Sequence, residues 1–195
     1  MFAIGSILGM ISTVAAVIVY LRKGRGPGPA LGLLGIPGAL ALVYTVVDAF
    51  GIPTINDIST DRIYPPEFVH AATLPENADR DLEFPSVNRE LIEKFYPDVR
   101  PLPSTESVDD VFIRALELAE AQPGWEITAR RVEADVSTFE GTVTSPVFHF
   151  VDDFVVRITR AGDDGSVIDM RSKSRDGTSD LGVNAKRIRE FLDKL

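Results

Sequence analysis

The stretch Phe154-Val-Val-Arg-Ile-Thr-Arg-Ala-Gly-Asp-Asp-Gly-Ser-Val-Ile-Asp-Met170 predicts a β-hairpin from which the fold can be built outward. Apolar and polar residues alternate on both sides of Gly162–Gly165, which is typical of half-buried strands. Two aspartates flanked by glycines are a turn signal between such strands. The pattern therefore predicts an antiparallel pair, with Ile168 and Met170 facing the core.

Three further segments extend this pair into a sheet. Trp125–Arg130 and Val132–Thr138 alternate, and the second is expected to place Val132, Ala134 and Val136 on one side. A longer alternating run is expected to contain a polar break at Asp152-Asp153; its apolar members are Phe148, Phe150, Phe154, Val156 and Ile158. After the turn, Val167–Ser174 forms the last strand. Short turns between neighbours indicate an antiparallel meander.

Helical patterns precede and follow these strands. Ser107–Ala121 can be capped by Ser104, Thr105 or Ser107 and ends at Gln122-Pro-Gly124; its apolar face is Val108, Val111, Phe112, Ala115, Leu118 and Ala119. Ser179–Leu195 is predicted as the last helix, with a buried stripe of Leu181, Ile188, Phe191, Leu192 and Leu195. The predicted fold class is α+β, an antiparallel meander sheet with helices on one face, preceded by a two-helix transmembrane hairpin.

The predicted hairpin occupies residues 1–50, which hold only four charged residues. Two apolar runs, at about 2–21 and 30–50, match the roughly 20 residues that a helix needs to cross a bilayer. Between them, Arg22-Lys-Gly-Arg-Gly-Pro-Gly-Pro29 is a polar loop, and Pro37 predicts a kink in the second run. The lipid bilayer is therefore an expected partner.

The positive-inside rule orients this hairpin. Arg22, Lys23 and Arg25 are expected in the cytoplasm, which places residues 51–195 in the periplasm or otherwise outside the inner (cytoplasmic) membrane. A cytoplasmic domain is the alternative. Cleavage as a signal peptide is disfavoured, because the basic cluster follows the apolar run instead of preceding it.

Residues 51–195 divide into an extended, Pro-rich acidic arm at 51–106 and an α+β domain at 107–195. The arm has a short helix near Asn88–Phe95 and apolar side chains that need cover, such as Phe68 and Phe84. Only three of the 20 basic and one of the 29 acidic residues precede residue 51, so the remainder carries a formal charge of −11. Such a domain is a poor match for nucleic acid.

The polar run from Arg171 to Asn184 is the candidate site. On a strand, Arg171, Lys173 and Arg175 share one face, opposite Ser172 and Ser174. The hydroxyls and free amides at the start of the next helix, together with guanidinium groups, suit a phosphate or carboxylate. The candidate ligand-binding residues are Arg171, Arg175, Ser179, Asn184 and Arg187. Asp180, Asn184 and Arg187 are expected on one helix stripe.

A structural role for the same cluster is the competing interpretation. Arg171 and Arg175 would then pair with Asp152, Asp153 or Asp169, and Ser179 or Asp180 would cap the helix. Asp152-Asp153 lacks the further ligands that a cation needs, and His70 and His149 lack metal-ligand spacing, so no metal or cofactor is expected. The absence of cysteine excludes disulfides, thiolate zinc sites and a cysteine nucleophile.

Three functions remain open from these residues. The first is a non-catalytic binding or interaction module for an anionic small molecule or a protein, because no nucleophile elbow or phosphate loop is present. The second is a membrane-surface enzyme with Asp152, Asp153 and Asp180 as acid or base groups. The third is a scaffold that docks a partner through the acidic arm, which an exposed apolar patch there would support.

Several motifs together resemble the bacterial and plastid family known as domain of unknown function 1499. They are Asn56-Asp-Ile-Ser-Thr-Asp61, Pro65-Pro-Glu-Phe68, Tyr96-Pro97, Pro123-Gly-Trp125, Asp152-Asp153, Val156-Arg157 and, most specifically, Arg171-Ser-Lys-Ser-Arg175 running through Gly177 into Ser179-Asp-Leu-Gly-Val-Asn-Ala-Lys-Arg-Ile188. The resemblance covers nearly all of residues 55–195. It implies a common fold and, by the family's own description, no particular activity.

Overall fold

The computed structural model describes residues 53–146 and 148–195. The two predicted membrane helices, at about 2–21 and 30–50, lie outside these residues. Within the described part, no helix is both long and apolar enough to cross a bilayer. Residues Pro53–Leu195 form one compact unit.

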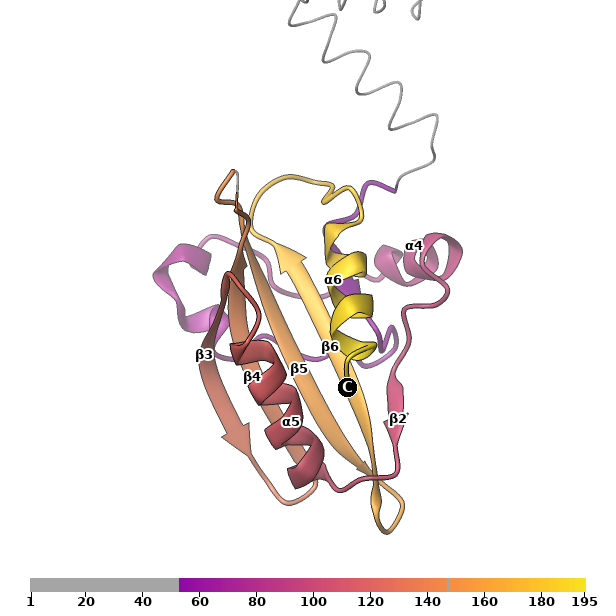
Figure 1. Ribbon diagram of the computed structural model, residues 1–195. Helices are drawn as coiled ribbons and strands as arrows, with labels where there is room; N and C mark the ends of the chain where they lie inside the picture. The colour runs from indigo at the N-terminus through magenta and orange to yellow at the C-terminus, as the bar shows by residue number, and fades with distance from the viewer. Residues whose placement is uncertain (1–52, 147) are drawn as a thin grey trace, which may run out of the picture. The chain divides into compact units, whose positions relative to one another are not determined.

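A six-stranded antiparallel sheet is the centre of this unit (Figure 1). Its elements, in chain order, are β1 Asp57–Ser59, α4 Val87–Phe95, β2 Leu102–Ser104, α5 Val108–Glu120, β3 Trp125–Val132, β4 Val136–Thr144, β5 Val151–Ala161, β6 Gly165–Ser174 and α6 Val183–Leu192. Short 3-10 turns lie at Ala71–Thr73 and Pro75–Asn77. Strands β3 to β6 form the predicted meander, which confirms the α+β fold class.

The segment before residue 107 supplies both short strands at one edge of the sheet. β1 pairs with the C-terminal half of β6 and β2 pairs with its N-terminal half. Between them the chain crosses behind the sheet, and α4 packs beside β1 (Figure 1). The arm is thus built into the sheet, which buries its apolar residues Phe68 and Ala71 against Val155.

Helices α5 and α6 cover the other face, as predicted (Figure 1). Ser107 caps α5 by accepting a hydrogen bond from the Asp110 N–H at 3.2 Å. Phe112 of α5 meets Phe139 of β4 edge to face, and Trp125 of β3 stacks on Phe191 of α6. These contacts close an apolar core between the helices and the sheet.

Two strand predictions were wrong. Val132 ends β3 and Val136 begins β4, so Ala134 lies in the exposed turn between them instead of within one strand. Asp152 and Asp153 do not break a strand: both are buried inside β5, where arginines from α6 and from the arm neutralise them. Phe148 and Phe150, expected on that strand, lie before it and are exposed.

The start of the last helix was also predicted wrongly. Helix α6 begins at Val183, and the preceding Leu181 and Gly182 have left-handed backbone conformations with φ of 54° and 86°. Left-handed residues cannot continue a right-handed helix, so Ser179 and Asp180 lie in a loop. Leu181 therefore projects outward, whereas Ile188 and Phe191 are buried as expected.

Candidate functional site

The arm-covered face of the sheet contains a buried ion network centred on Arg171. This side chain is only 2% exposed, and its Nε and Nη2 atoms donate to the two carboxylate oxygens of Asp57 at 2.9 and 2.7 Å. It also donates to the carbonyls of Pro66 and Leu82. The rings of Phe68 and Phe84 lie 4.6 and 5.2 Å from its guanidinium. Arg171 thus ties β6 to β1 and to the arm.

A second part of the network is centred on Asp153. Its carboxylate accepts hydrogen bonds from Arg175 at 2.7 Å and from Arg80 of the arm at 2.7 Å. The bond to Asp153 is the main cause that raises the pKa of Arg175. Lys173 lies between the two centres and contacts Asp57 at 3.1 Å. Arg175 directly follows β6, and its side chain lies on the same face of the sheet as those of Arg171 and Lys173, as predicted.

The opposite face of β6 carries a separate polar cluster beneath α6. Asn184 is fully buried; its Oδ1 accepts from Ser172 Oγ at 2.7 Å, and its Nδ2 donates to Ser174 Oγ and to the Asn56 carbonyl at 3.0 Å each. Arg187 donates to Ser172 Oγ and to Asn184, and forms a 2.5 Å ion pair with Asp152. These bonds fasten α6 to the sheet.

The loop before α6 is held by its own hydrogen bonds. Ser179 Oγ donates to the Pro53 carbonyl at 3.2 Å, and Asp180 accepts from the N–H groups of Gly182 and Asn184 at 2.9 and 2.7 Å. Burial raises the pKa of Asp180, an effect that its two N–H donors partly offset. Ser179 does not cap α6. Asp180, which lies in the loop before α6, instead accepts a hydrogen bond from the N–H of Asn184 in the first turn of the helix.

The five candidate ligand residues are consequently divided between two faces. Arg171 and Arg175 lie beneath the arm, Asn184 and Arg187 lie beneath α6, and Ser179 lies in the loop at the end of the sheet. Each makes hydrogen bonds to other residues of the chain. Arg175 pairs with Asp153 as the structural interpretation anticipated, and Arg171 pairs with Asp57, which the sequence did not single out.

The carboxylates considered for catalysis are separated as well. Asp152 and Asp153 are consecutive in β5, so their side chains point to opposite faces, toward Arg187 and toward Arg175. They cannot hold one metal ion together. Among residues 53–146 and 148–195, no group of three His, Asp or Glu side chains is suited to a metal.

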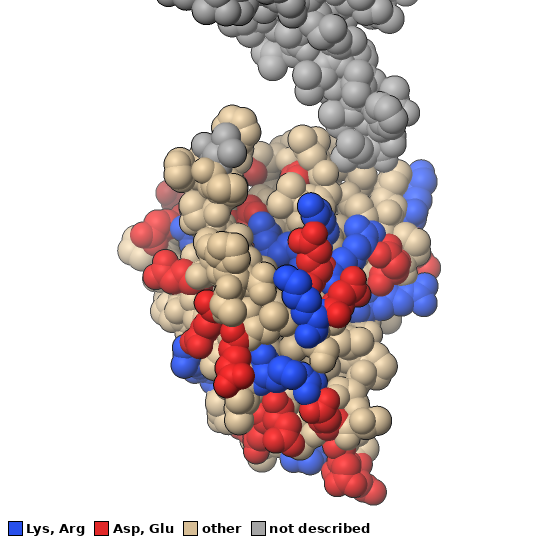
Figure 2. All heavy atoms as spheres, in the orientation of Figure 1, with Lys and Arg blue, Asp and Glu red and all other residues tan. Residues whose placement is uncertain are grey.

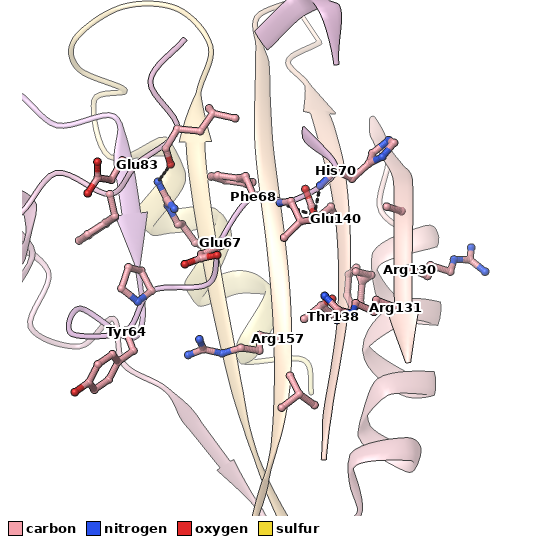
Figure 3. A pocket seen from close by; sticks show the side chains of 18 of the residues that line it. Tyr64, Glu67, Phe68, His70, Glu83, Arg130, Arg131, Thr138, Glu140 and Arg157 are labelled. Atoms are coloured by element: carbon pink, nitrogen blue, oxygen red, sulfur yellow. Dashed lines mark hydrogen bonds between the residues drawn. The ribbon is translucent and has the colours of Figure 1, made fainter. Parts of the chain in front are cut away.

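A groove of about 1070 Å³ lies elsewhere, between the arm and the β3–β4 side of the sheet (Figure 3). The arm covers only part of this face: it buries Glu140 of β4, whereas Thr138 of β4 is half-buried and Arg131 of β3 is exposed. Tyr64, Glu67, Phe68 and His70 line it from the arm. The groove was not predicted from the sequence.

The floor of the groove is a cross-strand row of polar side chains. Arg131 of β3 pairs in register with Thr138 of β4, and Thr138 with Arg157 of β5. In Figure 3, Arg157 extends toward the arm side of the groove, whereas Arg130 points away from it, where it pairs with Glu120. Arg131 is exposed and pairs with Glu133 at 2.5 Å.

Arg157 is the floor residue with unused hydrogen-bonding capacity. Its Nη2 donates to Asp169 at 2.9 Å and to Asp61 at 3.2 Å. Its Nε is buried and has no hydrogen-bond partner within the described residues. A buried donor without a partner costs free energy.

Glu140 fixes one wall of the groove. Its carboxylate accepts hydrogen bonds from the consecutive backbone N–H groups of Val69, His70 and Ala71, at 2.9, 2.8 and 2.9 Å (Figure 3). Three N–H groups converging on a carboxylate resemble an anion-binding nest, filled here by a side chain from β4. This contact holds the arm in place over the sheet.

The groove has an apolar rim, and its charges are nearly balanced. Ile63, Tyr64 and Val69 of the arm are exposed beside the arginines of the floor. The opposite face of the domain, which carries the helices, also has acidic and basic side chains intermixed over its surface (Figure 2). The alternation of side chains along β3 to β5 puts Arg131, Thr138 and Arg157 on the face opposite Phe139 and Phe154. This sequence pattern could have predicted the residues of the groove floor.

Comparison with known proteins identifies the family. No curated protein is significantly similar to the chain. The family model described as "Protein of unknown function (DUF1499)" matches residues 57–195. The match begins at the first residue of β1 and contains the sheet, the groove and both polar clusters. The resemblance seen in the sequence motifs is thereby confirmed, and the chain belongs to the DUF1499 family.

Proposed function

We propose that the protein is a membrane-anchored, non-catalytic binding module whose site is the groove between the arm and strands β3–β5. The observation that carries this proposal is the row Arg131–Thr138–Arg157 on the groove floor, beside an exposed apolar rim. Guanidinium groups and a hydroxyl suit an anion, and the rim suits an apolar body. The ligand is therefore an amphipathic molecule with a phosphate or carboxylate group.

The residues of the two polar clusters serve the fold in this proposal. Arg171, Arg175, Asn184 and Arg187 hold the arm and α6 against β6, and Ser179 holds the loop before α6. Their hydrogen-bonding groups are directed at the protein itself. Only Arg171 also contributes to the wall of the groove.

Catalysis by Asp152, Asp153 and Asp180 receives little support from this arrangement. The three carboxylates face different elements and do not line the groove. Docking of a protein partner through the arm is the second candidate function, favoured by the exposed side chains of Ile63, Tyr64 and Val69.

The membrane anchor and the compartment in this proposal rest on the sequence. The apolar runs of residues 1–50 support insertion, and Arg22, Lys23 and Arg25 support an extracytoplasmic location for the domain. Because the chain has no cysteine, a single Asp163→Cys substitution in the exposed β5–β6 turn reports its side of the membrane. Labelling of intact cells by a membrane-impermeant maleimide is expected; labelling only after lysis would place the domain in the cytoplasm.

The groove is tested by filling it. Ala129→Trp adds a large side chain to the floor of the groove on β3, next to Glu140 in register. Full-length protein in nanodiscs is titrated calorimetrically with 1-naphthyl phosphate and with 1-naphthol, which lacks the anion. We expect the phosphate to bind the unmodified protein more tightly than the alcohol, and Ala129→Trp to abolish binding.

A matched control variant distinguishes a blocked groove from a general effect of a new tryptophan on strand β3. Val132→Trp changes an exposed residue of the same strand that does not line the groove, so binding should be retained. Equal affinity for 1-naphthyl phosphate and 1-naphthol would show that the groove has no subsite for an anion. Equal binding by both tryptophan variants would show that the ligand lies outside the groove.

A further inference from the structure

The end of the sheet at which the described chain begins also carries two exposed loops. The carbonyls of Pro53 and Ile55 accept hydrogen bonds from Ser179 and Asp180, which join the first described residues to the loop before α6. The Arg175 N–H donates to the Val151 carbonyl, which joins that loop to the start of β5. Figure 1 accordingly shows the β4–β5 loop, the β6–α6 loop and the first described residues at one end of the sheet.

Large apolar side chains are exposed on both loops. Phe148 is 73% exposed and Phe150 is 54% exposed, and their rings stack with centroids 5.6 Å apart. Leu181 projects from the neighbouring loop, and Val183, the first residue of α6, is exposed beside it. Stacked rings left in water are costly unless something else covers them.

The β4–β5 loop holds these rings in a defined position. Ser145 and Phe150 close its base: the Ser145 N–H donates to the Phe150 carbonyl at 2.8 Å, and the Phe150 N–H donates to Ser145 Oγ at 2.9 Å. His149 has a left-handed φ of 55°, which turns the backbone between the two phenylalanines. The rings are thus presented outward by hydrogen bonds within the loop.

The charge of this end suits lipid better than the rest of the domain does. Thr144–Phe150 contains no Asp, Glu, Lys or Arg, and Figure 2 shows the loop as an uncharged projection. The neighbouring loop has one exposed carboxylate, that of Asp176, whereas the carboxylate of Asp180 is occupied by the N–H groups of Gly182 and Asn184. The domain as a whole is strongly acidic, which disfavours contact between its other surfaces and anionic lipid.

The chain before Pro53 limits how far this end of the domain can lie from the proposed membrane anchor. The second apolar run ends at Phe50, so only Gly51 and Ile52 separate it from the folded domain. An extended chain of this length reaches roughly 10 Å. If the run spans a bilayer, as proposed above, the end of the sheet that carries Pro53 must lie close to the membrane surface.

We propose that Phe148 and Phe150, together with Leu181, insert into the lipid interface and hold this end of the domain against the bilayer. Aromatic and aliphatic side chains partition favourably at the boundary between headgroups and acyl chains. The inference rests on the proposed membrane anchor and adds a second contact between protein and membrane. It would orient the groove relative to the bilayer, because a domain held at two points does not rotate freely about its linker.

The absence of cysteine makes the test direct. Phe148→Cys and Leu181→Cys each receive an environment-sensitive fluorophore in the full-length chain, reconstituted into phosphatidylcholine vesicles that contain a nitroxide-bearing lipid. Asp163→Cys in the β5–β6 turn, at the opposite end of the sheet, is the matched control. We expect a blue shift and loss of most emission at both loop positions, with neither effect at the control position.

Other outcomes distinguish a failure of lipid insertion by the loops from a failure of the proposed membrane anchor. Alkaline washing of the same vesicles reports the anchor alone: release of the chain would overturn the anchor and the inference together. Retention of the chain, with loop probes as unquenched as the control, would overturn lipid insertion and leave the anchor standing. A blue shift without quenching by the lipid nitroxide would show that a protein partner or a second copy covers the rings, which also overturns the inference.

Discussion

Arg171 and Asp57 lie 114 residues apart in the chain, yet they meet through two nearly parallel hydrogen bonds of 2.9 and 2.7 Å. Both side chains are almost completely buried, at an edge where β1 pairs with β6. A bidentate guanidinium–carboxylate pair needs both charges and a fixed orientation. This pair therefore favours one register of β1 on β6, and its loss should destabilise the domain.

Asp57→Asn should destabilise the domain by about 3–5 kcal/mol, because it leaves the buried guanidinium of Arg171 and the ammonium of Lys173 without their carboxylate. Urea denaturation followed by circular dichroism measures the loss. Arg131→Met breaks an exposed ion pair with Glu133 and should cost less than about 1 kcal/mol. Similar losses for the two variants would contradict a structural role for the Arg171–Asp57 pair.

Glu140→Gln should loosen the arm locally. The amide side chain has one oxygen acceptor in place of the two carboxylate oxygens that bind Val69, His70 and Ala71, and it has no charge. A loss of about 1–3 kcal/mol is expected at this contact. Hydrogen exchange of those three amides should accelerate, whereas Glu133→Gln in the exposed β3–β4 turn should leave it unchanged. Unaltered exchange in Glu140→Gln would exclude the carboxylate as the anchor of the arm.

Asn184→Ala should separate α6 from the sheet. The substitution removes acceptors and donors for Ser172, Ser174 and the Asn56 carbonyl, at about 1–3 kcal/mol for each buried group left without a partner. Lys186→Ala, on the exposed side of the same helix, is the comparison and should change stability little. The measurement is the free energy of unfolding in urea; equal values for both variants would refute the role given to Asn184.

Asp180 should make the stability of the domain depend on pH. Burial raises its folded-state pKa above the unfolded value, so its contribution is fully present below the unfolded pKa and is lost as pH rises through the folded pKa. Asp180→Asn lacks this titration. The unfolding free energy of the unmodified protein should therefore fall relative to that of Asp180→Asn across this interval. A difference that is constant with pH, or that changes in the opposite direction, would contradict the prediction.

Local sequence patterns were sufficient for much of the fold. α5 was predictable because its apolar spacing, its Ser107 cap and the following Pro-Gly all lie within one short segment. The turn at Gly162–Gly165 and the inward positions of Ile168 and Met170 follow from equally local rules. The placement of Arg171 and Lys173, and of Arg175 just after the strand, on one face of the sheet follows from the two-residue repeat of a β-strand.

Errors occurred where distant residues decided the outcome. Asp152 and Asp153 had the composition of a turn, but ion pairs with Arg187 of α6 and Arg80 of the arm stabilise them inside β5. Leu181 had helical spacing, yet the left-handed backbone around Gly182 ends that pattern. Ala134 lies in a turn because the pairing of β3 with β4 ends at Val132 and Ser137, which leaves Ala134 outside both strands.

The amino-acid sequence by itself determined the class of fold, the meander and the family, because periodicity, composition and motifs are properties of neighbouring residues. Only the tertiary structure decided that the predicted anion cluster is divided between two faces of β6, and that a groove floored by Arg131, Thr138 and Arg157 lies elsewhere. Which charges meet, and which face stays open, depends on the path of the arm across the sheet. That path is set by contacts between residues about a hundred positions apart, whose partners local patterns do not specify.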